Sequence, residues 1–119
     1  MTQYLRGQVW FYRTDRIANG QIQGANRPVV IVSNDIGNAH APILTVVPCT
    51  TAKKNRLPTH AHISLTHPST AMCEQVQTVN KSDLTDYMQA LGAKEMDTLD
   101  NCLSVAMGLN PIPQRRASV

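Results

Sequence analysis

The sequence has little charge and little cysteine. Charged residues make up 16% of its 119 positions, below the roughly 25% typical of soluble domains. This favours a compact folded chain with an uncharged interaction surface over disorder. Its three cysteines, Cys49, Cys73 and Cys102, are odd in number and lie in apolar contexts. They therefore indicate reduced core thiols in the cytoplasm rather than a disulfide framework.

Several functional signatures are also missing. No hydrophobic run approaches the roughly 20 residues that span a bilayer, and the N-terminus lacks the basic-then-apolar layout of a signal peptide. We therefore expect no membrane partner and a cytoplasmic protein. There is no glycine-rich phosphate loop, no paired-carboxylate site and no zinc signature. The sequence thus predicts no cofactor and no metal.

The charge is distributed unevenly along the chain. Residues 1–60 hold seven Lys and Arg against two Asp, whereas residues 61–119 hold four against six Asp and Glu. The net charge of +3 therefore hides a basic first half. A cationic region of this kind suggests a polyanionic partner.

β-branched runs and alternating patterns predict a mainly β domain. Val29–Val32 and Ile43–Val47 are typical of buried strands, and the polar residues 13–26 indicate a loop. Residues 33–38 carry turn chemistry. We predict strands over 7–12, 28–33, 43–47, 59–65, 72–79 and 87–91, a helical turn near Ser82, and a helix over 94–109.

The C-terminal helix completes the fold prediction. Met96, Leu99 and Leu103 recur at helical spacing, so one stripe packs on the sheet. Both faces of the first strand are apolar, which implies that a partner subunit or a ligand covers the second. We predict a small antiparallel barrel plus a C-terminal helix in one domain, residues 1–109, followed by a flexible tail, 110–119.

Arg27 and Thr50 are the residues to which we assign chemistry. Each stands at one end of a predicted core strand, where its side chain is aimed by a rigid element. The Arg fork suits phosphate oxygens, and the Thr hydroxyl is a small donor or acceptor. Together they suit the phosphorane formed when an RNA 2′-OH attacks the adjacent phosphorus. The alternatives are a solvated or ion-paired Arg and a Thr bonded to backbone.

Other candidates carry weaker signals. His60 and His62 share one face of a predicted strand, where exposed histidines are the ordinary outcome and a metal site lacks a third ligand. The basic turn of Lys53, Lys54 and Arg56 suits phosphate contacts or plain solvation. Cys49 alternates away from Thr50, so it is not a nucleophile candidate. Glu74 and Gln75 form a polar pair inside an apolar strand, which suggests a site or an interface.

Six ordered pieces of the chain resemble the MazF/PemK (Kid) family of toxin endoribonucleases from bacterial toxin–antitoxin pairs. The resemblance runs from Arg6 to about Leu109. The pieces are Arg6-Gly7-Gln8-Val9-Trp10, Gly24-Ala25-Asn26-Arg27-Pro28-Val29-Val30, Ser33-Asn34-Asp35-Ile36-Gly37-Asn38, Val47-Pro48-Cys49-Thr50, Leu57-Pro58-Thr59-His60 and Glu74-Gln75-Val76-Gln77-Thr78-Val79-Asn80-Lys81.

The resemblance implies an SH3-like barrel, a homodimer, and metal-independent cleavage of single-stranded RNA at short motifs. The products would be a 2′,3′-cyclic phosphate and a 5′-OH. It implies that Arg27 and Thr50 are catalytic and that Gln75 touches RNA. The other expected RNA-binding residues are Thr51, Lys53, Lys54, Arg6 and Glu74. A disordered acidic C-terminal segment of a cognate antitoxin would block the RNA groove, and operator DNA would be bound only through that antitoxin.

The sequence departs from the pattern of this family at two places. Relatives often differ at Ala25-Asn26 and carry an acidic residue where His62 stands, which leaves the RNA sequence preference open.

Two alternative functions accompany the toxin endoribonuclease. A CcdB-like barrel that poisons DNA gyrase without chemistry is the first alternative, although the tail Pro113-Gln114-Arg115-Arg116 has no convincing match to such proteins. An inactive homologue that only pairs with an antitoxin and operator DNA is the second.

Overall fold

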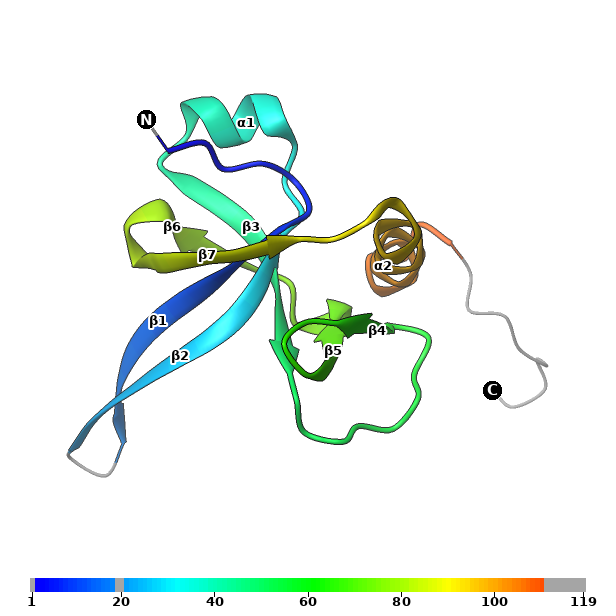
Figure 1. Ribbon diagram of the computed structural model, residues 1–119, viewed down its shortest axis with the longest axis horizontal. Coiled ribbons are helices and arrows are strands. Elements are labelled where there is room, and N and C mark those ends of the chain that lie inside the picture. The colour runs from blue at the N-terminus through cyan, green and yellow to red at the C-terminus, as the bar shows by residue number, and fades with distance from the viewer. Residues whose placement is uncertain (1, 19–20, 111–119) are drawn as a thin grey trace.

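The computed structural model describes residues 2–18 and 21–110, which form a strongly curved antiparallel sheet with a C-terminal helix (Figure 1). The fold class predicted from the sequence is confirmed. The elements are β1 (Gln8–Ala18), β2 (Gln21–Ile31), α1 (Asp35–His40), β3 (Ile43–Thr50), β4 (His60–Ser64), β5 (Pro68–Met72), η1 (Cys73–Gln75), β6 (Gln77–Asn80), η2 (Lys81–Asp83), β7 (Leu84–Ala90) and α2 (Ala93–Ala106).

The strands pair in the order β4-β5-β3-β2-β1-β7, and β6 pairs with the first half of β3. Within the described part of the chain the pairing runs from β4 to β7 without joining the two, so the sheet is barrel-like and not closed. β3 pairs with β2 up to Pro48 and with β5 at Cys49 and Thr50. The end of β3 is therefore the place where the two halves of the sheet meet.

The prediction of a loop over residues 13–26 is wrong. β1 and β2 continue pairing from Val9 and Val30 out to Ala18 and Gln21, which makes a long hairpin that projects from the body (Figure 1). The sequence there is polar and without period because the arms extend beyond the core. Backbone hydrogen bonds along the ladder hold such a ribbon without apolar side chains.

Two further segments differ from the prediction. The expected strand over 72–79 is divided: β5 ends at Met72, the single 3₁₀ turn η1 follows, and β6 begins at Gln77. The polar turn over 33–38 leads into the short helix α1, whose cap Asn34 accepts a hydrogen bond from the Gly37 N–H at 2.7 Å. The sequence signal there was a helix cap, which shares its residue types with turns. The predicted turn near Ser82 and the C-terminal helix are confirmed as η2 and α2.

Two apolar clusters lie on opposite faces of the sheet, as the alternation in the first strand predicts. The second face, which we expected a partner subunit or a ligand to cover, is already buried around Trp10 by side chains of the same chain. The helix-side cluster lies under α2, with Leu99 fully buried, and the aromatic-side cluster is built around Trp10. The helix-side cluster comprises Val9, Val30, Val32, Val47, Cys49, Ala61, Ile63, Ala71, Cys73, Leu91 and Leu99. The aromatic-side cluster comprises Trp10, Val29, Ile31, Leu44, Val46, Val79 and Leu84, with Tyr4 and Tyr12 beside it.

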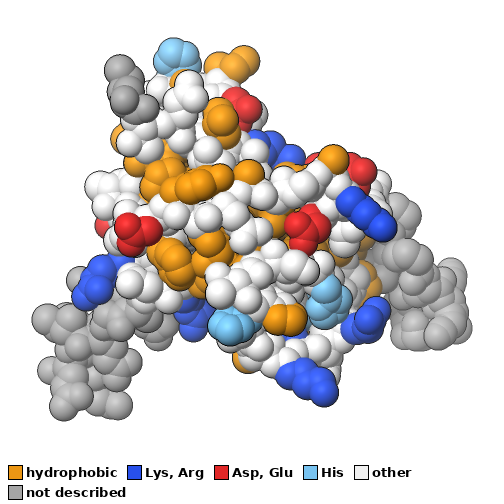
Figure 2. Space-filling model, in the orientation of Figure 1, with side chains coloured by type: hydrophobic (Ala, Val, Ile, Leu, Met, Phe, Trp, Pro, Cys, Tyr) orange, Lys and Arg blue, Asp and Glu red, His pale blue; other side chains and the backbone are white. Residues whose placement is uncertain are grey.

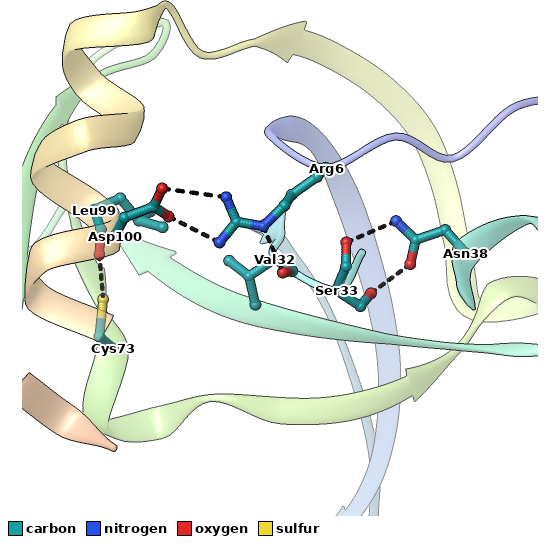
Figure 3. A network of polar contacts seen from close by, with 7 residues as sticks. All are labelled: Arg6, Val32, Ser33, Asn38, Cys73, Leu99 and Asp100. Atoms are coloured by element: carbon teal, nitrogen blue, oxygen red, sulfur yellow. Dashed lines mark hydrogen bonds and ion pairs between the residues drawn. The ribbon is translucent and has the colours of Figure 1, made fainter. Parts of the chain in front are cut away.

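The N-terminal segment fastens α2 to the sheet. Arg6 forms an ion pair with Asp100 at 2.8 Å, and its Nε donates to the Val32 carbonyl at 2.8 Å (Figure 3). Gly7 has φ +92°, a left-handed conformation that favours glycine. Its N–H donates to the Ile31 carbonyl, and its own carbonyl accepts from Leu91 N–H just before α2. This segment thus joins the end of β2 to the start of the helix.

Candidate active site

Arg27 lies on β2 opposite Tyr12 of β1, and its side chain is exposed. Alternate residues of a strand share a face, so Arg27 continues the row of Val29 and Ile31 in the aromatic-side cluster. Pro28 follows it at half-buried depth. The Arg27 guanidinium is therefore presented to solvent beside a rigid core segment.

Thr50 is the last residue of β3 and lies opposite Thr70 of β5. Its side chain is partly exposed, and its Oγ1 accepts a hydrogen bond from Ala52 N–H at 3.1 Å. The hydroxyl proton remains available for a second partner because this bond uses only an oxygen lone pair. The hydroxyl is thus held by the turn after β3 with its donor function intact.

The register of β2 and β3 relates these two positions. The ladder pairs Ile31 with Val46 and ends with Val29 paired to Pro48. Two residues beyond that last pair, Arg27 on β2 and Thr50 on β3 continue the same two rows on the same face of the sheet. The residues chosen from sequence therefore stand in neighbouring rows, just beyond the point where β3 leaves β2 for β5. Arg27 is not at a strand end as the sequence predicted, because β2 begins at Gln21 and continues through it.

A groove of about 580 Å³ begins at the residue after Thr50. One wall is the exposed β3–β4 loop and the other is the β4–β5 hairpin, and Figure 2 shows Lys, Arg and His side chains gathered over this region. The structure thus brings together three of the predicted RNA-binding residues. The lining residues that carry charge or hydrogen-bonding groups are Thr51, Lys53, Lys54, Arg56, His62, Ser64, Ser69 and Thr70.

His60 lies beside this groove and is buried, which overturns the expectation of an exposed strand histidine. Only 5% of its side chain is exposed. Its Nδ1 lies 2.9 Å from the Asn55 carbonyl oxygen and its Nε2 lies 2.9 Å from Glu74 Oε2. Glu74 also accepts from Thr59 Oγ1 at 2.8 Å. The unusual polar residue that the sequence marked in an apolar stretch is thus the partner of a buried imidazole.

The Glu74 carboxyl has a lowered pKa. Partial burial acts against the charged form, but hydrogen bonds from the His60 ring, the residue's own backbone N–H and Thr59 outweigh it and bring the pKa below its ordinary value of 4.5. Glu74 is therefore a carboxylate at neutral pH. Its bonds to His60 and Thr59 hold it in place, and its contact with RNA stays a prediction.

Two other predicted RNA-binding residues lie apart from the groove. Gln75 is exposed on η1, and its amide donates to Met72 Sδ at 3.5 Å. Arg6 uses its guanidinium on Asp100 and on the Val32 carbonyl, beyond the opposite end of β2 from Arg27. Contact of either residue with RNA stays a prediction.

The cysteine thiols fit the interpretation of Cys49 as unreactive. Burial is the main cause that raises the pKa of Cys49 to about 12, and the neighbouring Cys73 adds to it. Cys49 pairs with Ala71 and lies in the helix-side cluster, on the opposite face from Thr50. Within the described residues, no group of three or more His, Cys, Asp or Glu side chains is arranged to hold a metal ion.

Solved structures define the class of this fold. The chain is similar to a mycobacterial endoribonuclease solved in complex with its cognate antitoxin, with a TM-score of 0.74 and 28% identity over 92% of this chain and 99% of that one. It also shares the fold, at 15% identity and a TM-score of 0.78, with MazF of a MazE–MazF complex from Deinococcus radiodurans, over 92% of this chain and 100% of the matched one. The class is that of small mainly β toxins.

The chain belongs to the family of PemK-like, MazF-like toxins of type II toxin–antitoxin systems, which it matches over residues 5–107. It is 32% identical to Endoribonuclease MazF of Staphylococcus saprophyticus over 94% of this chain and 98% of that protein. It is 34% identical to Endoribonuclease EndoA of Bacillus subtilis over 87% and 94%. These relatives are named as enzymes that cleave RNA internally. None of the described helices is long and apolar enough to cross a membrane.

Proposed function

We propose that this protein is a toxin endoribonuclease that cuts single-stranded RNA in the bacterial cytoplasm without a metal ion. The observation that carries the proposal is the placement of Arg27 and Thr50 on one face of the sheet, two residues beyond the last β2–β3 pair, with a cationic groove that begins at the residue after Thr50. Near-full-length relatives named as endoribonucleases support it. The groove supplies the positive charge that a flexible phosphodiester chain requires.

The proposed reaction is an internal transesterification. The RNA 2′ oxygen bonds to the adjacent phosphorus, the bond from phosphorus to the 5′ oxygen breaks, and a 2′,3′-cyclic phosphate forms. The proton lost by the 2′-OH is balanced by the proton that the leaving 5′ oxygen gains. Arg27 stabilises the added negative charge of the phosphorane, because a guanidinium does not readily give up its proton. Thr50 donates its hydroxyl proton as a hydrogen bond to a phosphoryl oxygen.

Two partners complete the proposal. Exposed apolar side chains include Ile43, Tyr87, Met107 and Leu109, and a groove of about 450 Å³ beside α2 is lined by Val76, Leu103 and Met107. We propose that the chain forms a homodimer and that these surfaces accept a cognate antitoxin, whose acidic segment folds on binding. The antitoxin complex of the mycobacterial relative supports this. Light scattering on the purified chain measures its oligomeric state.

The test is cleavage of a long single-stranded RNA in EDTA. The wild type yields discrete fragments whose 5′ ends accept phosphate from polynucleotide kinase without prior phosphatase treatment. Arg27→Ala abolishes the fragments, whereas Lys94→Ala, an exposed cation on α2, leaves them unchanged. RNA that stays intact across varied sequences contradicts the proposal. Growth arrest with intact RNA would favour a toxin that acts by binding alone.

A further inference from the structure

Both ring nitrogens of His60 have a close oxygen partner. Both ring nitrogens face oxygen atoms that only accept hydrogen bonds: the Asn55 carbonyl at Nδ1 and the Glu74 carboxylate at Nε2, each at 2.9 Å. A neutral imidazole has one N–H and satisfies one of these acceptors, whereas the imidazolium satisfies both. Only 5% of the His60 side chain is exposed to solvent. Both contacts are therefore hydrogen bonds only when both ring nitrogens carry protons.

The two bonds of His60 join the packed body of the protein to an exposed loop. Glu74 belongs to η1, which also contacts α2 and β3, so it is part of the rigid body. Asn55 belongs to the exposed stretch 51–58, which contains no regular secondary structure. This stretch carries Lys53, Lys54 and Arg56 along the groove. His60 is thus the side chain through which the rigid body holds the cationic loop.

A backbone hydrogen bond also attaches the loop to the start of β4. His60 N–H donates to the Leu57 carbonyl at 3.0 Å, so the loop turns back on the start of β4. Asn55 stands between Lys54 and Arg56 in the sequence. A bond to its carbonyl fixes the backbone from which these two side chains project. Loss of that bond leaves the long exposed loop with far more conformational freedom.

We infer that His60 is a positioning residue, which as an imidazolium links Glu74 to the Asn55 carbonyl and so fixes Lys54 and Arg56 along the groove that holds RNA phosphates. This inference rests on the proposed function, since RNA is the polyanion in the groove. His60 does not touch the reacting atoms in this scheme. Its role is to order cations that bind the strand on one side of the scissile bond.

Charged groups stand on both elements that His60 links. Glu74 on η1 faces the ring, and Lys53, Lys54 and Arg56 lie on the loop that the Asn55 contact attaches. From β5, the residue paired with His60 is the neutral Met72. His62 follows on the same face of β4, and α2 packs on the other face. Deprotonation turns one N–H···O bond into a contact between two acceptors, and the loop is released.

The experiment compares RNA binding and cleavage across about pH 6 to about pH 9, the range that brackets imidazole titration. Wild-type protein loses RNA affinity as the ring deprotonates, and KM rises several-fold with little change in kcat. Long-range ¹H–¹⁵N correlation spectra show both ring nitrogens of His60 protonated at the acid end. The slope of RNA affinity against salt falls by about 0.7 for each phosphate of a single strand that no longer binds a protein cation.

Two variants separate this role from general stability. His60→Gln weakens RNA binding and lowers the salt slope at every pH, because a side-chain amide cannot supply two donors in this geometry. Glu74→Gln presents an amide donor to Nε2, so a neutral ring then satisfies both partners and the pH dependence of KM flattens. His40→Gln, an exposed histidine in the last turn of α1, is the matched control and retains the wild-type profile.

The results that would contradict the proposed function differ from those that would contradict the positioning role of His60. If the wild type cuts no RNA, the proposed function fails. If the wild type cuts RNA and both His60→Gln and Glu74→Gln keep its salt slope and its pH profile of KM, the positioning role is wrong. A ring spectrum with one protonated nitrogen at the acid end overturns it as well. Should His60→Gln fail to fold, the Glu74→Gln profile and the wild-type spectra decide the matter.

Discussion

Arg6 and Asp100 form a two-point ion pair across 94 positions of the sequence, with contacts of 2.8 and 3.3 Å. The same guanidinium donates through Nε to the carbonyl of Val32, so one side chain touches both α2 and the residue after β2 (Figure 3). Such bidentate geometry is the favourable case among exposed ion pairs. The Arg6 guanidinium thus bonds to Asp100 and Val32 of the same chain.

The first prediction concerns this ion pair. Asp100→Ala lowers the free energy of unfolding by about 1 kcal/mol, the upper end of values for partly exposed pairs. The measurement is urea denaturation, and the loss shrinks at high salt because the pair is partly screened. Asp97→Ala, an exposed residue on the same helix, gives a smaller loss. Equal losses for the two variants would show that the ion pair adds nothing.

The second prediction concerns the hydroxyl of Thr50. Thr50→Val removes the proposed donor to the phosphoryl oxygen, and kcat falls about 10²-fold, as for other lost transition-state donors. Thr50→Ser keeps the hydroxyl and retains most of the rate. Single-turnover cleavage measures the effect, with circular dichroism as a check on folding. A Thr50→Val protein as active as Thr50→Ser would remove Thr50 from the mechanism.

The third prediction concerns acid stability. The pKa of Glu74 is lower in the folded chain than its ordinary value of 4.5, so its ionised form stabilises the fold above that value. This contribution is lost as the pH falls through the lowered pKa. The stability difference between wild type and Glu74→Gln therefore shrinks from neutral pH to about pH 3. Urea midpoints at both pH values measure it, with Asp97→Asn as the control. A difference independent of pH would contradict the prediction.

The fourth prediction concerns the thiols. Burial raises the pKa of Cys49 and of Cys73 to about 12, with a smaller contribution from Cys73 at Cys49, and from Cys102 and then Glu74 and Asp100 at Cys73. Since the thiolate is the reactive form, both alkylate slowly in the native protein, and the half-buried Cys102 reacts first. Peptide mass spectrometry after timed iodoacetamide treatment gives the order, and unfolding in urea makes the rates equal. Cys49→Ala retains RNA cleavage.

The parts of the fold that the sequence predicted have strong local patterns. Val29–Val32 and Ile43–Val47 lie within or directly beside β2 and β3, and the apolar stripe of the C-terminal helix packs on the helix-side cluster through Leu99. Such segments carry their own periodicity. The hairpin over residues 13–26 was missed because its pairing depends on backbone bonds between two arms, and neither arm shows an apolar pattern.

The candidate site was likewise predicted from the sequence only in part. Arg27 and Thr50 were chosen from the ends of predicted strands, which sequence patterns locate. Thr50 does end β3, whereas Arg27 lies within β2, and both stand two residues beyond the last β2–β3 pair. The burial of His60 was not predictable from its own strand because its partners come from outside it. Glu74 lies 14 residues away on a 3₁₀ turn that the sequence suggested was part of a strand. The one available sign was the polar Glu74 itself among apolar neighbours.

The division of β2 between two cores has a consequence for how this toxin tolerates change. Val29 and Val30 are adjacent in the chain, are both fully buried, and belong to the aromatic-side and helix-side clusters respectively. The sheet acts as a wall with a separate hydrophobic interior on each side. A substitution on the side bearing Arg27 and Thr50 therefore changes the packing of the aromatic-side cluster first, and reaches the helix-supported interior only through the shared strands.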